Sequence, residues 1–190
     1  MELVIASNNK HKVKEIRAIL SGKFERIYAL ADLGISVDPE ETAPDFYGNA
    51  MIKAKAVAAF TDKAVIADDS GLEVMCLNGE PGVHSARYAG EPCSDQRNNQ
   101  KLLENMVGKP DRRARFVTTM VLLFPNGKSL VGLGEVKGHI LEKEKGENGF
   151  GYDPLFYADE LGKTFGESSD EEKNRVSHRS RALNDLLEKL

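Results

Sequence analysis

The chain is poor in cysteine and has no long apolar run. Its two cysteines, Cys76 and Cys93, show neither CxxC nor metal-ligand spacing, which excludes a disulfide framework and suits a reducing compartment. No apolar stretch approaches the ~20 residues that a membrane-spanning helix needs. The first residues, MELVIASNNK, lack the charged start and long apolar stretch of a signal peptide. We therefore expect a cytoplasmic protein with no membrane partner.

An excess of positive charge is also absent. The 190 residues include 26 Lys and Arg against 30 Asp and Glu, a formal net charge of −4. This argues against a nucleic-acid partner held by a basic face, although a local basic pocket remains compatible with it. We find no internal repeat. The length and a hydrophobic fraction of 41% predict one domain over residues 1–190, with a sizeable core.

Strand and helix patterns alternate in the first part of the chain, and a hairpin follows. The stretches Arg115–Phe124 and 129–136 are strand-like, and Pro125-Asn126-Gly127 between them is typical of a hairpin turn. Further strands are expected at Leu3–Ala6, 24–30 and 64–68, and helices after Asn9, at 48–60, 94–107 and 178–190. A hairpin makes an all-parallel sheet improbable. We predict an α/β fold, a mixed sheet with flanking helices, in two lobes around a central nucleotide-binding cleft.

The stretch AVIADDSGLEV (64–74) carries the strongest chemical signal. An apolar strand delivers two adjacent carboxylates, Asp68 and Asp69, to a sharp turn that begins with Ser70 and Gly71. Adjacent acids repel each other, and divalent-metal binding and general-base catalysis are two chemistries that use such a pair. The alternative is an ordinary solvated turn, because Asp, Ser and Gly are common turn residues.

The segment SNNKHK (7–12) stands between a strand and a helix. Backbone N–H groups at a helix start favour an anion, and Lys10 and Lys12 add positive charge, so a polyphosphate would fit. The segment is not a Walker A loop, since GxxxxGK[ST] occurs nowhere. The alternative is a capped helix with solvated lysines.

Two glutamates, Glu40 and Glu41, lie in a loop-like region. With Asp68 and Asp69 they would complete an oxygen-rich Mg²⁺ site, which needs only one or two carboxylates plus waters and substrate phosphates. Glu15, on the first helix, is a further candidate ligand. The alternative is that both loop glutamates are surface charge.

Two later segments suit a flat ligand. In GFGYDP (149–154) the glycines let backbone approach, Phe150 or Tyr152 would stack on a base, and Asp153 would accept from a ring N–H. Near the last helix, Lys173 precedes a Ser-His-Arg triplet whose Arg179 is able to donate to a purine O6 and N7. The alternatives are a tight turn with buried aromatics and a helix start with exposed charges. No histidines have zinc-ligand spacing.

Taken in order, these segments resemble the inosine triphosphate pyrophosphatase family, which hydrolyses deaminated purine nucleoside triphosphates. The matching pieces are SNNKHKVKE, EET with GNAMIKAKA, ADDSGLEV, PGVHSARYAG, GFGYDPLF and K…SHRSRAL, which span nearly the whole chain. One departure is Ser7-Asn8-Asn9, where many members have Thr-Gly-Asn. Ser7 keeps the hydroxyl. Asn8 stands in place of a glycine, and asparagine tolerates left-handed backbone geometry.

The resemblance implies cleavage of ITP, dITP, XTP and dXTP to monophosphate and pyrophosphate, with Mg²⁺ as cofactor. It also implies a homodimer and a role in cleansing the nucleotide pool. Residue roles are implied as well. Phosphate-binding residues would be Ser7, Asn8, Asn9, Lys10, His11, Lys12, Lys53, Ser70 and Lys173. Metal ligands would be Glu40 and Asp69, with Glu41 in reserve, and Asp69 would also be the general base, supported by Asp68. The base pocket would comprise Phe150, Gly151, Tyr152, Asp153, His178 and Arg179.

Other functions remain open at this point. A related pyrophosphatase acting on modified pyrimidines is the nearest alternative. A serine hydrolase using Ser70 is disfavoured because no GxSxG surrounds it. A non-catalytic nucleotide-binding protein is disfavoured because acids beside phosphate need a bridging metal.

Overall fold

The computed structural model describes residues 1–190, and the chain folds as two compact units. The first unit comprises residues 1–69, 118–134 and 179–190, and the second comprises 70–117 and 135–178. Division of the chain into two units agrees with the expected two lobes. The nucleotide-binding cleft and the assignment of all 190 residues to a single domain stay predictions.

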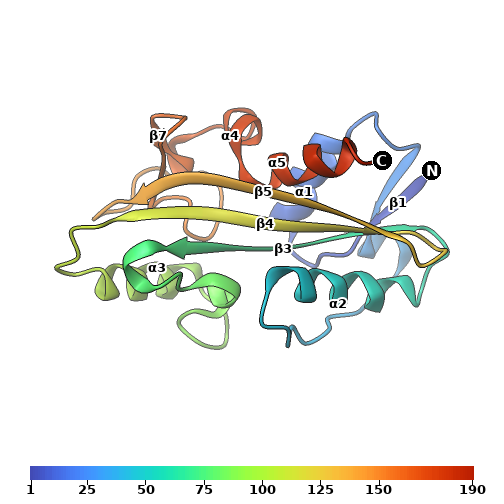
Figure 1. Ribbon diagram of the computed structural model, residues 1–190, viewed down its shortest axis with the longest axis horizontal. Coiled ribbons are helices and arrows are strands. Elements are labelled where there is room, and N and C mark those ends of the chain that lie inside the picture. Colours follow the sequence, from blue (N-terminus) through green and yellow to red (C-terminus); the bar gives the residue numbers. More distant parts are fainter. The chain divides into compact units, whose positions relative to one another are not determined.

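Seven strands and five α-helices form the fold (Figure 1). The strands are β1 (Glu2–Ile5), β2 (Arg26–Ala29), β3 (Ala64–Val74), β4 (Arg113–Leu123), β5 (Ser129–Ile140), β6 (Phe156–Ala158) and β7 (Lys163–Thr164). The helices are α1 (Lys10–Leu20), α2 (Phe46–Ala58), α3 (Asp95–Asn105), α4 (Asp170–Val176) and α5 (His178–Leu187). Four short 3₁₀ helices complete the list: η1 (Leu30–Leu33), η2 (Met75–Leu77), η3 (Gly82–Arg87) and η4 (Phe165–Glu167). None of the helices combines the length and apolar character needed to cross a bilayer.

All seven strands belong to one mixed sheet, in the order β2-β1-β3-β4-β5-β6-β7. β1 pairs in parallel with both β2 and β3, whereas β6 pairs antiparallel with β5 and β7. The predicted mixed α/β sheet is therefore confirmed. β4 and β5 are joined by the expected hairpin turn, in which Gly127 has φ of 83° and donates its N–H to Phe124 O. Such a φ strains any side chain with a Cβ, which explains glycine at this position.

In the first unit, side chains of each strand alternate between two helical layers. On one face, Leu3, Ile66 and Met120 pack with residues of α1 and α5 such as Ile16 and Leu183. The opposite face carries Val4, Val65 and Val121, which pack against Ala50, Ala54 and Val57 of α2. Figure 1 shows α1 and α5 on one side of the strands and α2 on the other. This two-residue period decides where the functional side chains of β3 point.

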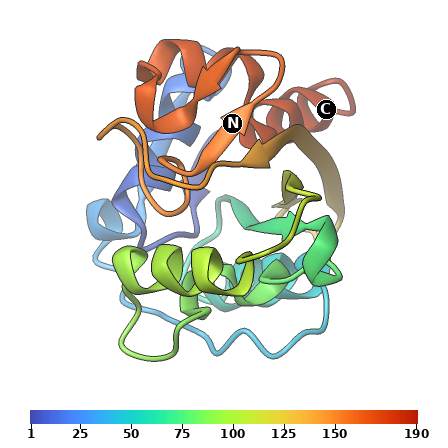
Figure 2. The same cartoon turned by 90° about the vertical axis from the view of Figure 1, so that its left-hand side faces the viewer.

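The second unit has its own core, also between two layers. α3 lies on one side of the strands, and α4 lies on the other (Figure 2). Buried members of the core include Leu72, Leu102, Phe116, Phe156 and Phe165. Ser94 caps α3 by accepting a hydrogen bond from Arg97 N, as expected of a helix that begins after a serine.

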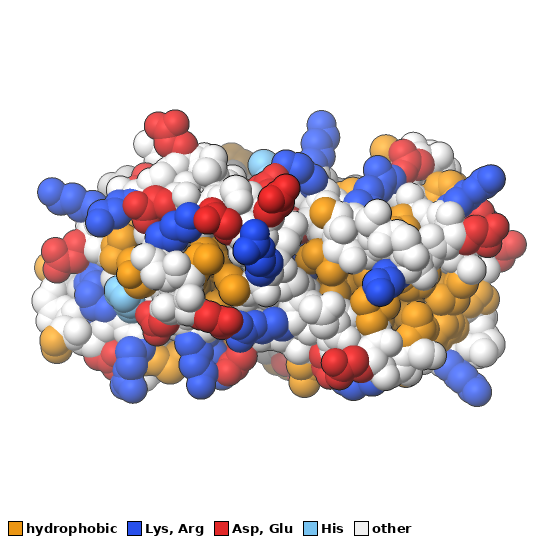
Figure 3. All heavy atoms as spheres, turned by 90° about the horizontal axis from the view of Figure 1, so that it is seen from above, with side chains coloured by type: hydrophobic (Ala, Val, Ile, Leu, Met, Phe, Trp, Pro, Cys, Tyr) orange, Lys and Arg blue, Asp and Glu red, His pale blue; other side chains and the backbone are white.

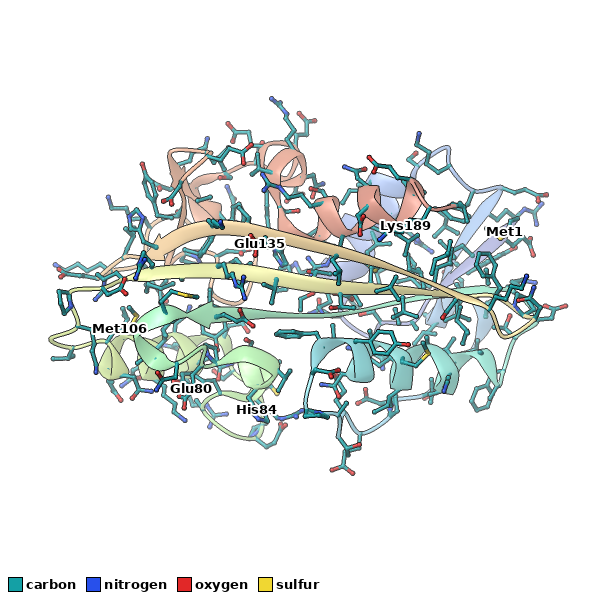
Figure 4. The ribbon with its side chains drawn as sticks, in the orientation of Figure 1. Met1, Glu80, His84, Met106, Glu135 and Lys189 are labelled. Atoms are coloured by element: carbon teal, nitrogen blue, oxygen red, sulfur yellow. The ribbon has the colours of Figure 1, made fainter.

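Charged side chains of both signs are interspersed on the surface (Figure 3). An example in the second unit joins three strands: Arg115 of β4 donates to Glu73 of β3 at 2.7 Å and to Glu135 of β5 at 2.9 Å. Glu135 is labelled in Figure 4. Because these side chains are partly exposed, such pairs stabilise the fold only modestly.

One expectation about local structure is wrong. Asp68 and Asp69 do not stand at a turn, because β3 continues without a break through Ser70 and Gly71 to Val74. The local turn signal of these residues does not reveal that the strand continues. Lys173 precedes the last helix, as expected, and lies within a separate short helix, α4, whose cap is Ser169.

Candidate functional site

Asp68 and Asp69 are buried in the middle of β3, and they point to opposite faces of the sheet. Asp68 continues the series Ala64, Ile66 that faces α1 and α5, and Asp69 continues the series Val65, Ala67 that faces α2. The two carboxylates are 2% and 5% exposed. Each therefore needs its own compensating partners, because an unpaired buried charge is costly.

Asp69 meets partners from α2. Asn49 donates to Asp69 Oδ2 at 3.2 Å, and Lys53 Nζ lies 3.4 Å from Asp69 Oδ1. Lys53 Nζ also lies 3.2 Å from Glu41 Oε2. Asn49 is fixed in turn, since its side-chain oxygen accepts from Ala43 N at 2.9 Å. Spacing of four residues puts Asn49 and Lys53 on one face of α2, so that both reach the same carboxylate.

Asp68 meets partners from α1 and α5. Lys12 Nζ lies 3.1 Å from Asp68 Oδ2, and Arg179 Nε donates to the same oxygen at 3.3 Å. The guanidinium of Arg179 also donates to Glu15 of α1. Arg179 is 1% exposed, so this pairing takes place away from water. Lys12, Glu15, Asp68 and Arg179 thus form a buried ionic network in the first unit.

Burial perturbs the acid–base behaviour of these groups. Desolvation raises the pKa of Asp69 to about 6, and Glu41 adds to this, while Lys53 and Lys12 oppose it. Burial lowers the pKa of Lys12 despite the attraction of Asp68. For Lys53 burial also acts downward, but the charges of Asp68, Asp69 and Glu41 outweigh it and raise the pKa. Asp69 is therefore a carboxylate with raised proton affinity beside two cations.

The oxygen atoms of Asp69 and Glu41 converge on one positive charge, the ammonium of Lys53. No group of three or more His, Cys, Asp or Glu side chains is placed to hold a metal ion on its own. Two hard oxygen donors nevertheless fit Mg²⁺, which usually binds through one or two carboxylates and keeps its other positions for waters and substrate phosphates. Glu40 is exposed and Glu41 contacts Lys53, which favours Glu41 as the second donor, while the expected choice of Glu40 stays a prediction.

The Ser7–Lys12 segment forms an ordinary helix cap as well as a polar loop. Asn9 Oδ1 accepts from His11 N at 3.0 Å and from Lys12 N at 3.3 Å, so these two N–H groups are already satisfied. Asn8 does not adopt left-handed geometry, since Asn78 is the one non-glycine residue with positive φ. Its side chain donates to Val37 O at 3.0 Å and ties the loop to the segment after η1.

A second cluster of candidate residues lies in the second unit. Lys173 of α4 pairs with Asp153 Oδ2 at 2.7 Å, and both side chains are buried. The ammonium also lies 4.7 Å from the centre of the Phe150 ring and 5.5 Å from that of Phe165. Phe150 N donates to Asp153 Oδ2 at 2.9 Å, and Gly149, with φ of 74°, leaves the space that the Asp153 carboxylate occupies. Asp153 and Lys173 thus hold the backbone and the ring of Phe150 in place.

Tyr152 and His178 are packed as part of the second unit's core. Tyr152 donates its hydroxyl to Ser85 O at 2.6 Å, and burial raises its pKa. The ring of His178 stacks on Phe116, with centres 4.8 Å apart and planes 13° apart. Of the two aromatics considered for stacking on a base, Phe150 is therefore the better placed, because Tyr152 is buried and already hydrogen-bonded.

Arg179 is held by two carboxylates of the first unit. Its guanidinium is buried in the first unit against Asp68 and Glu15, whereas Phe150, Asp153 and His178 belong to the second unit. The expected base-reading role of Arg179 stays a prediction. Its contacts with two buried carboxylates are not evident from sequence spacing alone.

Sequence reasoning missed several supporting residues. Asn49 lies in the GNAMIKAKA segment, four residues before Lys53, so helical spacing was an available signal. Asp95 and Asn99 of α3 hold Gly151: Asp95 accepts from Gly151 N at 2.8 Å, and Asn99 donates to Gly151 O at 3.2 Å. No sequence signal links α3 to a loop about fifty residues later.

Comparison with known proteins gives a consistent result. A model of the Ham1 family matches residues 3–189. A curated relative from Thermoanaerobacter sp. (strain X514), named dITP/XTP pyrophosphatase, is 46% identical over 184 residues, covering 96% of this chain and 93% of the relative. The solved structure of the Staphylococcus aureus Ham1 protein is similar with a TM-score of 0.85 and 45% identity, covering 97% and 95% of the two chains. A HAM1 protein from Coxiella burnetii is similar with a TM-score of 0.89 and 37% identity over the full length of both chains.

These matches span nearly the whole chain and confirm the resemblance that the ordered motifs indicated. The fold, the motifs and the comparisons agree: the chain belongs to the Ham1 family.

Proposed function

We propose that the protein hydrolyses deaminated purine nucleoside triphosphates, namely ITP, dITP, XTP and dXTP, to the monophosphate and pyrophosphate. The observation that carries the proposal is the arrangement of Asp69, Glu41 and Lys53, two carboxylates sharing one cation. Relatives named dITP/XTP pyrophosphatase at 46% identity support the substrate class. Mg²⁺ dependence, a homodimer and a cytoplasmic location are parts of the same proposal.

The reaction needs a water molecule to attack the α-phosphorus while pyrophosphate leaves. Asp69 accepts the proton of the attacking water, for which its raised pKa of about 6 is suitable near neutral pH. Asn49 holds the Asp69 carboxylate in one orientation, so that its other oxygen is directed toward Lys53. Lys53 and Lys12 offset negative charge on the phosphates, where positioned charges stabilise the transition state.

Charge counting in the first unit explains why a metal is part of the proposal. Glu15, Glu41, Asp68 and Asp69 supply four negative charges, and Lys12, Lys53 and Arg179 supply three positive ones, which leaves 3 − 4 = −1. A triphosphate approaching such a cluster is repelled. Asp69 and Glu41 would hold Mg²⁺, which when bound supplies positive charge to the phosphate oxygens.

The second unit supplies the face for a purine. Phe150 offers an aromatic surface, while Lys173 and Asp153 place a donor and an acceptor beside it. Hypoxanthine and xanthine carry an acceptor at position 6, whereas adenine carries a donor there. The pairing of Lys173 with Asp153 favours a role at the base rather than the phosphate-neutralising role expected from the sequence. A donor that hydrogen-bonds the acceptor at position 6 of hypoxanthine, and finds none on adenine, would contribute about 1–3 kcal/mol of selectivity.

A substrate panel tests the proposal. We expect ITP, XTP and their deoxy forms to yield pyrophosphate and monophosphate at least about tenfold faster, in kcat/KM, than ATP or modified pyrimidine triphosphates. Excess EDTA should abolish the activity, and added Mg²⁺ should restore it. Pyrophosphate release that is undiminished in EDTA would contradict the metal-assisted reaction, and a preference for pyrimidines would contradict the substrate class.

Substitution of the general base gives a second prediction. Asp69→Asn should reduce turnover by about 10²–10⁴-fold while nucleotide still binds, because Asn keeps the size and some hydrogen bonds but does not accept the proton. Asp62→Asn is the matched control, since Asp62 is 94% exposed in the same unit, and it should leave turnover unchanged. Near-normal turnover in Asp69→Asn together with an inactive Asp68→Asn variant would reverse the assignment within the pair.

The raised pKa of Asp69 also predicts how stability depends on pH in the metal-free protein. The folded state holds this proton more tightly than the unfolded state, so the stabilising contribution is present at low pH and is lost as pH rises through about 6. In EDTA, we expect the wild type to lose about 1 kcal/mol of unfolding free energy relative to Asp69→Asn between about pH 5 and about pH 7. Urea unfolding at both pH values measures this difference. Parallel pH dependence in the two proteins would show that Asp69 is not perturbed.

A further inference from the structure

A cavity of about 410 Å³ lies on the opposite side of α1 from Asp68. It is lined by residues of the first unit alone: Ser7, Asn8, Lys10, Val13, Lys14, Arg17, Ala29, Leu30 and Ala31. On α1, Lys10, Val13, Lys14 and Arg17 follow one another at intervals of three, one and three residues, which places them on one helix face. Lys12 and Glu15, which face Asp68 and Arg179, occupy the other. The cavity is therefore separate from the carboxylate cluster.

The charge of the lining is unusual for this protein. Three of its nine residues are cationic and none is acidic, although the whole chain carries more acidic than basic residues. Arg17 is held in place because its guanidinium donates to Asp32 and to Ile27 O at 3.3 Å. Asp32 is itself anchored by Ala29 N at 2.8 Å. The buried Nε of Arg17 has no hydrogen-bond partner in the structure. Arg17 has Asp32 as a counter-ion, and the further positive charge of Lys10 and Lys14 at the lining favours entry of an anion.

The position of the cavity in the fold bears on ligand binding, and its remaining wall and volume indicate the size of the ligand. Ser7 and Asn8 follow the carboxyl end of β1, and Ala29 to Ala31 span the carboxyl end of the parallel strand β2. Ligands of open α/β sheets bind at this edge of the sheet, most often where the strand order reverses, which here is between β1 and β3, one strand away from the cavity. Val13, Ala29 and Leu30 add an apolar wall. The cavity volume lies within the range of small-molecule sites and is far larger than one phosphate requires.

We infer that this cavity is a second ligand site, which binds a phosphate monoester of nucleoside size. The phosphate would lie among Lys10, Lys14 and Arg17, and the apolar body would lie against Val13 and Leu30. The inference goes beyond the proposed hydrolysis and does not require it. The backbone N–H groups of His11 and Lys12 are not part of the site, because Asn9 already accepts from both.

The test is binding of AMP, measured by calorimetry with EDTA present, with adenosine and inorganic phosphate as partial ligands. Two variants alter the cavity: Lys14→Glu reverses a charge at its rim, and Ala31→Phe fills its space. Both residues are exposed and neither belongs to the proposed catalytic machinery. Lys55→Glu is the control, since it makes the same charge change at an exposed site on α2 of the same unit.

We expect AMP to bind the wild type and Lys55→Glu equally, and to bind Lys14→Glu and Ala31→Phe at least about tenfold more weakly, since a charged hydrogen bond or the space is lost. Adenosine should not bind, and phosphate should bind more weakly than AMP. ITP turnover, expressed as kcat/KM, should stay within about threefold in all variants.

Equal AMP binding in all four proteins, or phosphate binding as tightly as AMP, would overturn the inference. So would a loss of turnover that matches the loss of AMP binding, because the cavity would then be part of the substrate site. Failure of the proposed hydrolysis would appear differently, as absent turnover in the wild type with AMP binding unaffected.

Discussion

The pleat of β3 is the constraint on which the candidate site depends. Side chains of a strand alternate between its faces, so two carboxylates that are adjacent in sequence are directed to opposite sides of the sheet. Asp68 consequently meets Lys12 and Arg179 from α1 and α5, whereas Asp69 meets Lys53 and Asn49 from α2. The repulsion that an acid pair at a turn would suffer is avoided by geometry. Each acid has cationic partners of its own.

This separation gives the two acids different chemistry. The network of Asp68 includes a fully buried guanidinium with two carboxylate partners, and removal of one partner from such a network leaves an uncompensated buried charge. Asp69 shares Lys53 with Glu41, its pKa is raised by burial, and the pair of carboxylates is suited to a divalent cation. We therefore regard Asp68 and its partners as the group that positions β3 against α1 and α5, and Asp69 as the reacting carboxylate.

Much of the fold was predictable from the sequence, because its signals are local. Asn9 as a helix cap, Ser94 as another and the Pro125-Asn126-Gly127 turn each act within a few residues. The ordered motifs also identified the family. What the sequence did not reveal depends on distant partners. The turn expected at Asp68 and Asp69 is absent because β3 continues past both residues. The guanidinium of Arg179 donates to Glu15 and Asp68, which lie far away in the sequence. Only the folded loop shows that Glu41 rather than Glu40 contacts Lys53.

The central claim is that the α2 face of β3, with Asp69 and Glu41, is the cation-binding face. Affinity of the nucleotide-free protein for Mn²⁺, measured by electron paramagnetic resonance, tests this without turnover. Asp69→Asn and Glu41→Gln should each weaken Mn²⁺ binding by about tenfold or more, in line with the loss of a metal-ligand interaction. Asp68→Asn should weaken it less than either, and Glu40→Gln should leave it unchanged. If Asp68→Asn or Glu40→Gln weakens Mn²⁺ binding more than Asp69→Asn or Glu41→Gln does, the assignment of the cation to the α2 face is wrong.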